Sequence, residues 1–216
     1  MGQWSALLDV VDADPLRGSD GRWVTSDTLL TAILTPLYSQ GSWSWLDELY
    51  RTVTDGDGDT ALFLADFYND RVDGVYQSNL MEAFSAINCL DYPSSAELDV
   101  EQMRADAAEL EAIAPTIGRF QGYGAVFCAN WPFRGVETRE PVSGAGADPI
   151  LVIGTTGDPA TPYRWAVSLA EQLESGVLVT YEGEGHTAYG ENDCVDAIVE
   201  DYFLTGAVPA ADAVCS

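Results

Sequence analysis

Apolar residues recur every three or four positions through much of the first 140 residues, the spacing of helices that bury one face. No stretch of this part shows the strict apolar–polar alternation of a half-buried strand. The aromatic and glycine-rich stretch 121–133 fits neither pattern, and we expect it to be a link that packs on helices. The spacing predicts helices over residues 26–39, 42–54, 59–72, 78–89 and 94–115.

Small polar residues mark the predicted starts of two of these helices. Ser26 or Asp27 is the expected cap of the first, and Asp59 is the expected cap of the third, since short polar side chains accept hydrogen bonds from the free amides of a first turn. We therefore predict that residues 1–140 form one mostly helical region.

The pattern changes near residue 140, after the turn-rich joint 139–147. Residues 148–154 form a continuous apolar run, which is typical of a strand buried on both faces. A helix is predicted over 162–174, a second strand over 176–183, and a closing helix over 192–206 that ends at Gly206. Strand–helix–strand–helix predicts an α/β segment with a parallel sheet. We therefore expect two domains, residues 1–140 and 141–216.

A carboxylate and an imidazole follow the two predicted strands. Asp158 comes after the first strand, and His186, the chain's single histidine, comes after the second. Carboxyl ends of parallel strands meet at one edge of a sheet, so the two side chains are expected to be neighbours. Acyl-transfer chemistry requires an imidazole base whose orientation and charged form are stabilised by a carboxylate. The simpler alternative is that Asp158 caps a turn and that His186 is a polar loop residue.

The acidic composition narrows the range of partners. The formal net charge is -26, and all nine basic residues are arginines. Nucleic acids and anionic membranes are therefore excluded as partners, because binding them requires clustered cations. No apolar run approaches a membrane span of about 20 residues. The charge favours cationic ligands such as a free amino terminus, although an acidic surface also simply keeps a protein soluble.

The four cysteines indicate an oxidising compartment, which places the protein outside the cell or in the cell envelope. They are spaced too widely for a zinc site, so no metal or other cofactor is expected. Of the three possible connectivities, Cys89–Cys128 with Cys194–Cys215 keeps each bridge in one half of the chain, and free buried thiols are the alternative. The acidic stretch 55–60 lacks the glycine and the glutamate that a calcium loop needs.

Residues 148–190, "DPILVIGTTGDPATPYRWAVSLAEQLESGVLVTYEGEGHTAYG", with the closing helix and tail, resemble the C-terminal part of secreted tripeptidyl aminopeptidases. These are α/β-hydrolase serine peptidases akin to proline iminopeptidases. The resemblance implies that Asp158 and His186 are the catalytic acid and base, and that Cys194 pairs with Cys215. Residues 20–135, with "YSQGSWSWLDELY" and "EAFSAINCLDYP", resemble the family's helical lid more loosely.

One element of the resemblance has no counterpart in these 216 residues. The α/β-hydrolase triad runs Ser, acid, His, and its serine lies in a G-x-S-x-G elbow. No serine of this chain has that setting. The expected fold is therefore a C-terminal hydrolase part with an incomplete sheet, preceded by a lid. The first half, with the nucleophile and a signal peptide, is expected upstream.

The resemblance implies a peptide substrate with a free N-terminus. Glu82 and Asp91 are the candidate partners of its ammonium group, although both could be ordinary solvated charges. Two other interpretations stay open. The chain could be a non-catalytic remnant that binds peptides or a partner, or it could belong to an esterase of the same fold.

Overall fold

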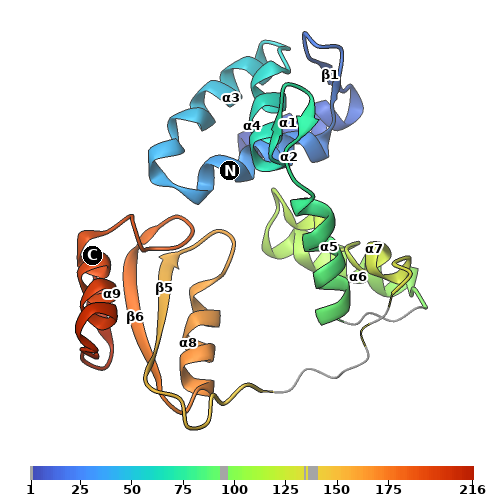
Figure 1. The fold of residues 1–216 in the computed structure, drawn as a ribbon. Helices are drawn as coiled ribbons and strands as arrows, with labels where there is room; N and C mark the ends of the chain where they lie inside the picture. Colours follow the sequence, from blue (N-terminus) through green and yellow to red (C-terminus); the bar gives the residue numbers. More distant parts are fainter. Residues whose placement is uncertain (1, 93–96, 134, 136–140) are drawn as a thin grey trace. The chain divides into compact units, whose positions relative to one another are not determined.

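Helices account for most of the N-terminal part, as their hydrophobic spacing predicts (Figure 1). The computed structural model describes residues 2–92, 97–133, 135 and 141–216. Residues 94–96 of the predicted helix and the predicted domain boundary at residue 140 lie outside the described residues. Residues 97–99 were also predicted as helix, but the helix begins at Val100, with Asp99 as its N-cap. The chain forms two compact units, Met1–Thr35 with Trp45–Arg139, and Pro36–Ser44 with Glu140–Ser216.

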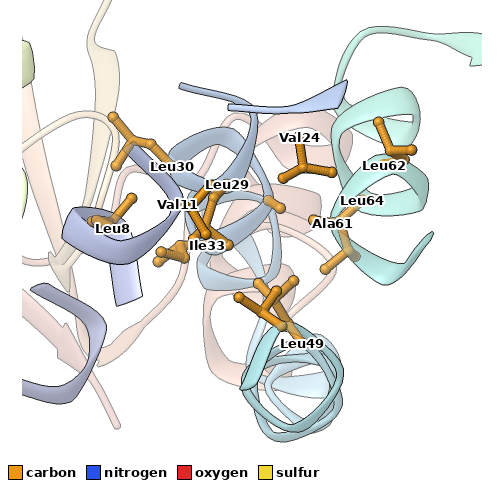
Figure 2. Packing of buried hydrophobic residues seen from close by; sticks show 12 residues of the cluster. Leu8, Val11, Val24, Leu29, Leu30, Ile33, Leu49, Ala61, Leu62 and Leu64 are labelled. Carbon is orange, nitrogen blue, oxygen red and sulfur yellow. The ribbon is translucent and has the colours of Figure 1, made fainter. Parts of the chain in front are cut away.

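The first unit buries a core of aliphatic side chains from its first four helices (Figure 2). Leu8, Leu29 and Leu49 are completely buried, and Val24 of a short hairpin closes the cluster. Truncating such a leucine removes about 2–5 kcal/mol of stability, because the cavity left behind does not fully collapse. The helices are α1 (Gly2–Ala13), α2 (Ser26–Leu34), α3 (Ser44–Thr54), α4 (Asp59–Tyr68), α5 (Leu80–Asp91), α6 (Val100–Ile113) and α7 (Ala125–Ala129).

Several helix ends differ from the predicted ones. α2 ends at Leu34 rather than at residue 39, because Pro36 has no amide to continue the ladder; the chain goes on as a 3-10 turn, Thr35–Tyr38. Its N-cap is Thr25, so the prediction of Ser26 or Asp27 was wrong by a residue or two. The cap of α4 is Gly58 rather than Asp59, whose carboxylate instead accepts a hydrogen bond from the amide of Ser19.

The expectation of no strands in this part was also wrong. Two short antiparallel hairpins are present, β1 (Leu16–Arg17) with β2 (Trp23–Val24), and β3 (Arg71–Val72) with β4 (Val75–Tyr76). Asp73 and Gly74 turn the second hairpin with φ values of 50° and 82°. An Asp-Gly pair between two valines is a recognised hairpin signal, so the sequence did contain the information.

A disulfide joins Cys89 of α5 to Cys128 of α7, which confirms the first predicted bridge. This disulfide is important for holding α5 in place, because the helix buries little apolar surface: Leu80, Phe84 and Ile87 are more than half exposed. The predicted link 121–133 thus contains a short helix that carries half of the bridge.

The second unit is built on a three-stranded parallel sheet, β5 (Ile150–Gly157), β6 (Gly176–Glu184) and β7 (Ala213–Cys215), in that order. Both predicted strands are confirmed, whereas β7 lies in the tail, for which no strand is predicted. Three residues carry no periodicity, so only their pairing with β6 and the Cys194–Cys215 disulfide reveal the strand.

Helices α8 (Tyr163–Gln172) and α9 (Asp193–Thr205) flank this sheet on opposite faces (Figure 1). Ile153 of β5 packs against the buried cluster that contains Val195 and Val199 of α9. The next residue, Gly154, points the other way, and a Cβ there would collide with Tyr163 and Ala166 of α8. Glycine in mid-strand therefore lets α8 lie close against the sheet.

Candidate active site

Asp158 and His186 emerge from neighbouring strands at the same end of the sheet. β5 and β6 run parallel, and their last paired residues are Gly157 and Glu184. Asp158 is the next residue after β5, and His186 is the second residue after β6. The parallel register therefore delivers both side chains to one edge, as the sequence predicts.

The two side chains are hydrogen-bonded. Nδ1 of His186 lies 2.9 Å from Oδ2 and 3.0 Å from Oδ1 of Asp158. The Asp158 side chain is only 5% exposed, while the imidazole is 28% exposed. Nδ1–H must donate to the carboxylate, so Nε2 on the far side of the ring carries the lone pair in the neutral form. A lone pair in that position is what a general base needs.

The carboxylate of Asp158 is fixed by its own loop. The amides of Ala160 and Thr161 donate to Oδ1 at 2.8 and 2.7 Å, and the Thr161 hydroxyl donates to Oδ2 at 2.9 Å. Burial opposes ionisation, but these hydrogen bonds and the one from His186 outweigh it and hold the pKa of Asp158 below its usual value. The acid is therefore ionised, and its orientation is set before any substrate arrives.

Thr161 was not singled out from the sequence. Besides its two hydrogen bonds to Asp158, its Oγ1 lies 3.3 Å from Nδ1 of His186. An Asp followed three residues later by Thr can form this kind of closed turn, so the signal was the spacing D-P-A-T. Loss of the hydroxyl would remove one of the two hydrogen bonds at Oδ2.

The loop that carries His186 is strained and anchored at both ends. Thr187 has a φ of 71°, which a β-branched residue rarely adopts. Its carbonyl accepts a hydrogen bond from the hydroxyl of Thr155 in β5. At the far end, the amide of Gly190 donates to Asp196 of α9 at 2.7 Å. A non-glycine residue at positive φ persists only where its surroundings hold it, which these bonds do.

The outer edge of β5 is open within the described residues of this unit, since β5 pairs only with β6 there. A cleft of about 320 Å³ runs along this edge beside Asp158. Trp165 and Leu169 of α8 and Tyr189 of the histidine loop line it, and each is 44–55% exposed. A strand that pairs on one edge only, with exposed apolar side chains beside its open edge, is typical of a sheet that continues.

The two candidate ligands for an ammonium group lie on α5 and are both exposed. Glu82 is in the first turn, and Asp91 is the last residue of the helix. Nine residues separate them, which amounts to about two and a half turns and about 13 Å along the axis. They therefore face opposite sides of α5, and a single ammonium group could contact only one of them.

The described residues contain no group of three potential metal ligands that lie together. Within the same residues, no helix has the length and apolarity needed to cross a bilayer.

A parallel sheet that presents a buried carboxylate to an imidazole at the carboxyl ends of adjacent strands has the architecture of a hydrolase that uses an acid–base pair. Comparison with known proteins agrees. Residues 114–215 match the family model described as TAP-like protein. Over these residues the chain is similar to the C-terminal part of α/β-hydrolase serine peptidases.

Named relatives match nearly the whole chain. Carboxylesterase B of Mycobacterium tuberculosis is 36% identical over all of this chain and 42% of its own length. Serine protease Hip1 of the same organism is 35% identical over 98% of this chain and 42% of its own length. Tripeptidyl aminopeptidase of Streptomyces lividans is 25% identical over 99% of this chain and 39% of its own length. The chain thus spans about two fifths of the length of these relatives, all of which are named as hydrolases.

Proposed function

We propose that this chain supplies the acid, Asp158, and the base, His186, of a serine peptidase. The nucleophilic serine comes from polypeptide outside these 216 residues. The observation that carries the proposal is the 2.9 Å hydrogen bond between the imidazole and a buried, ionised carboxylate. A turn cap or an ordinary loop histidine would not need that pairing.

The chemistry follows from the tautomer that this pairing selects. Nε2 of His186 removes the proton of the incoming serine hydroxyl as its oxygen attacks the scissile carbonyl. The imidazolium that forms is stabilised by Asp158 and then protonates the leaving amine. The open edge of β5 supports the source of the serine, since further strands of the sheet can pair there.

We propose that the substrates are peptides with a free amino terminus, because one relative is named as a tripeptidyl aminopeptidase. The net charge of -26 gives an amine-bearing peptide long-range attraction. Either Glu82 or Asp91 is the proposed partner of the ammonium group. We also place the protein in an oxidising compartment outside the cytoplasm, because both disulfides are formed.

Esterase activity is the second candidate, because one relative is named as a carboxylesterase. A panel of three substrates separates the two, assayed with the enzyme assembled from this chain and the serine-bearing polypeptide. We expect kcat/KM for a peptide with a free amine to exceed that for its acetylated form by about 10–100-fold, the effect of one charge-assisted hydrogen bond. Turnover of a simple ester alone would make the esterase correct. If no substrate is turned over although the serine is present, the chain would instead be a non-catalytic remnant that binds peptides or a partner.

If the amine preference is found, Glu82→Gln and Asp91→Asn identify its origin. One of the two substitutions should abolish the preference while leaving turnover of the acetylated peptide unchanged. Because the two residues face opposite sides of α5, each variant is the matched control for the other.

A further inference from the structure

A short segment from early in the chain forms part of the second unit. Residues 36–44, which contain the 3-10 turn Gln40–Ser42, pack with the α/β unit, whereas α2 before them and most of α3 after them belong to the helical unit. Pro36 at the start of the segment is completely buried. This arrangement is not predictable from the sequence, because 3-10 turns have no hydrophobic period long enough to detect.

This segment holds the backbone of the histidine loop. The amide of His186 donates to the carbonyl of Tyr38 at 2.8 Å. The preceding residue, Gly185, is buried and has a φ of 107°. A Cβ at that position would lie 2.9 Å from the same Tyr38 carbonyl oxygen. Only glycine allows the loop both this conformation and this close approach.

The side chain of Tyr38 contacts the imidazole itself. The two ring centroids are 5.1 Å apart, and the planes cross at 76°, which is an edge-to-face contact. Asp158 fixes the imidazole through Nδ1, while Tyr38 packs against the ring. A single hydrogen bond would still let the imidazole tilt or flip, whereas the two contacts together restrict both movements.

We propose that Tyr38 is a positioning residue for His186. Its carbonyl sets the path of the histidine loop, and its ring keeps Nδ1 of the imidazole on Asp158. The positioning role of Tyr38 rests on the proposed function only because it takes His186 to be the base. The new element is that residues 36–44, which are continuous in sequence with α2 and α3, help to orient that base.

His186 is the only histidine in the chain, so selective ¹⁵N-histidine labelling gives one imidazole and one histidine amide. For the wild-type chain at alkaline pH, we expect a single tautomer with the proton on Nδ1. Tyr38→Ala should populate the Nε2–H tautomer to at least a tenth of the molecules. Gly185→Ala should speed deuterium exchange of the His186 amide at least tenfold. In both variants, the amides of α9 should keep their wild-type exchange rates.

Two controls separate positioning from a general loss of structure. Tyr38→Phe keeps the ring and should restore the wild-type imidazole signals. Tyr189→Ala removes an aromatic side chain from the histidine loop itself and should leave those signals unchanged. Wild-type imidazole signals in Tyr38→Ala, together with wild-type amide exchange in Gly185→Ala, would overturn the proposal. The readouts need no serine, so they stand whether or not the peptidase activity is found.

Discussion

Replacing Asp158 with asparagine should lower kcat of the assembled peptidase by about 10⁴-fold, with little change in KM. The amides of Ala160 and Thr161 would still donate to Oδ1 of the asparagine, which leaves the loop in place. The NH₂ group would then face His186, where the carboxylate Oδ2 accepted before. Nδ1 would have to become the acceptor, and the proton would move to Nε2. The base would present its proton, rather than its lone pair, to the serine.

Asp148→Asn is the matched control, because it removes the same charge just before β5, at the opposite end of the strand from Asp158. It should leave kcat within about twofold of the wild type. A loss of less than tenfold in a folded Asp158→Asn variant would mean that the pair is structural. The same pair of variants, examined by ¹⁵N-histidine spectra, should show the tautomer switch only for Asp158→Asn.

Replacing Cys194 and Cys215 with alanine should destabilise the C-terminal unit by about 3 kcal/mol, as expected for a bridge that closes a loop of this size. Cys215 is also 2% exposed and belongs to the core cluster with Val195 and Val199, so its sulfur contributes packing. β7 is three residues long and lies one residue from the chain's last position. We expect the bridge to α9 to keep so short a strand paired with β6.

Hydrogen exchange measures this effect locally. Amides of β7 should exchange at least 100-fold faster in the double variant, since about 3 kcal/mol corresponds to roughly two powers of ten. Cys89→Ala with Cys128→Ala removes the other bridge and should leave β7 protected. Equal protection of β7 with and without the Cys194–Cys215 bridge would show that strand pairing alone holds it.

The parts of this protein that were predictable are those with a repeating pattern or a fixed spacing. β5, β6, α8 and α9 follow from their hydrophobic runs, and the meeting of Asp158 with His186 follows from parallel pairing. Both disulfides fit the connectivity that keeps each bridge in one half of the chain.

What escaped prediction depends on contacts distant in sequence or on very short elements. β7 exists because it pairs with β6, and residues 36–44 join the second unit through contacts with a loop far along the chain. Thr161 and Tyr38 support the site through a hydroxyl and a ring that no motif identifies. The end of α2 differs for another reason: the hydrophobic spacing continues past Leu34, but Pro36 has no amide to extend the helix.

We propose that this chain carries the acid and the base of the active site but not the nucleophile. Intact-mass analysis after treatment with a serine-directed fluorophosphonate tests this division of the triad. The 216-residue chain should remain unlabelled, alone or assembled. The serine-bearing polypeptide should be labelled when assembled with the wild-type chain, and at least 100-fold more slowly with His186→Ala. A fluorophosphonate adduct on any serine of the 216 residues would show that the nucleophile lies in this chain.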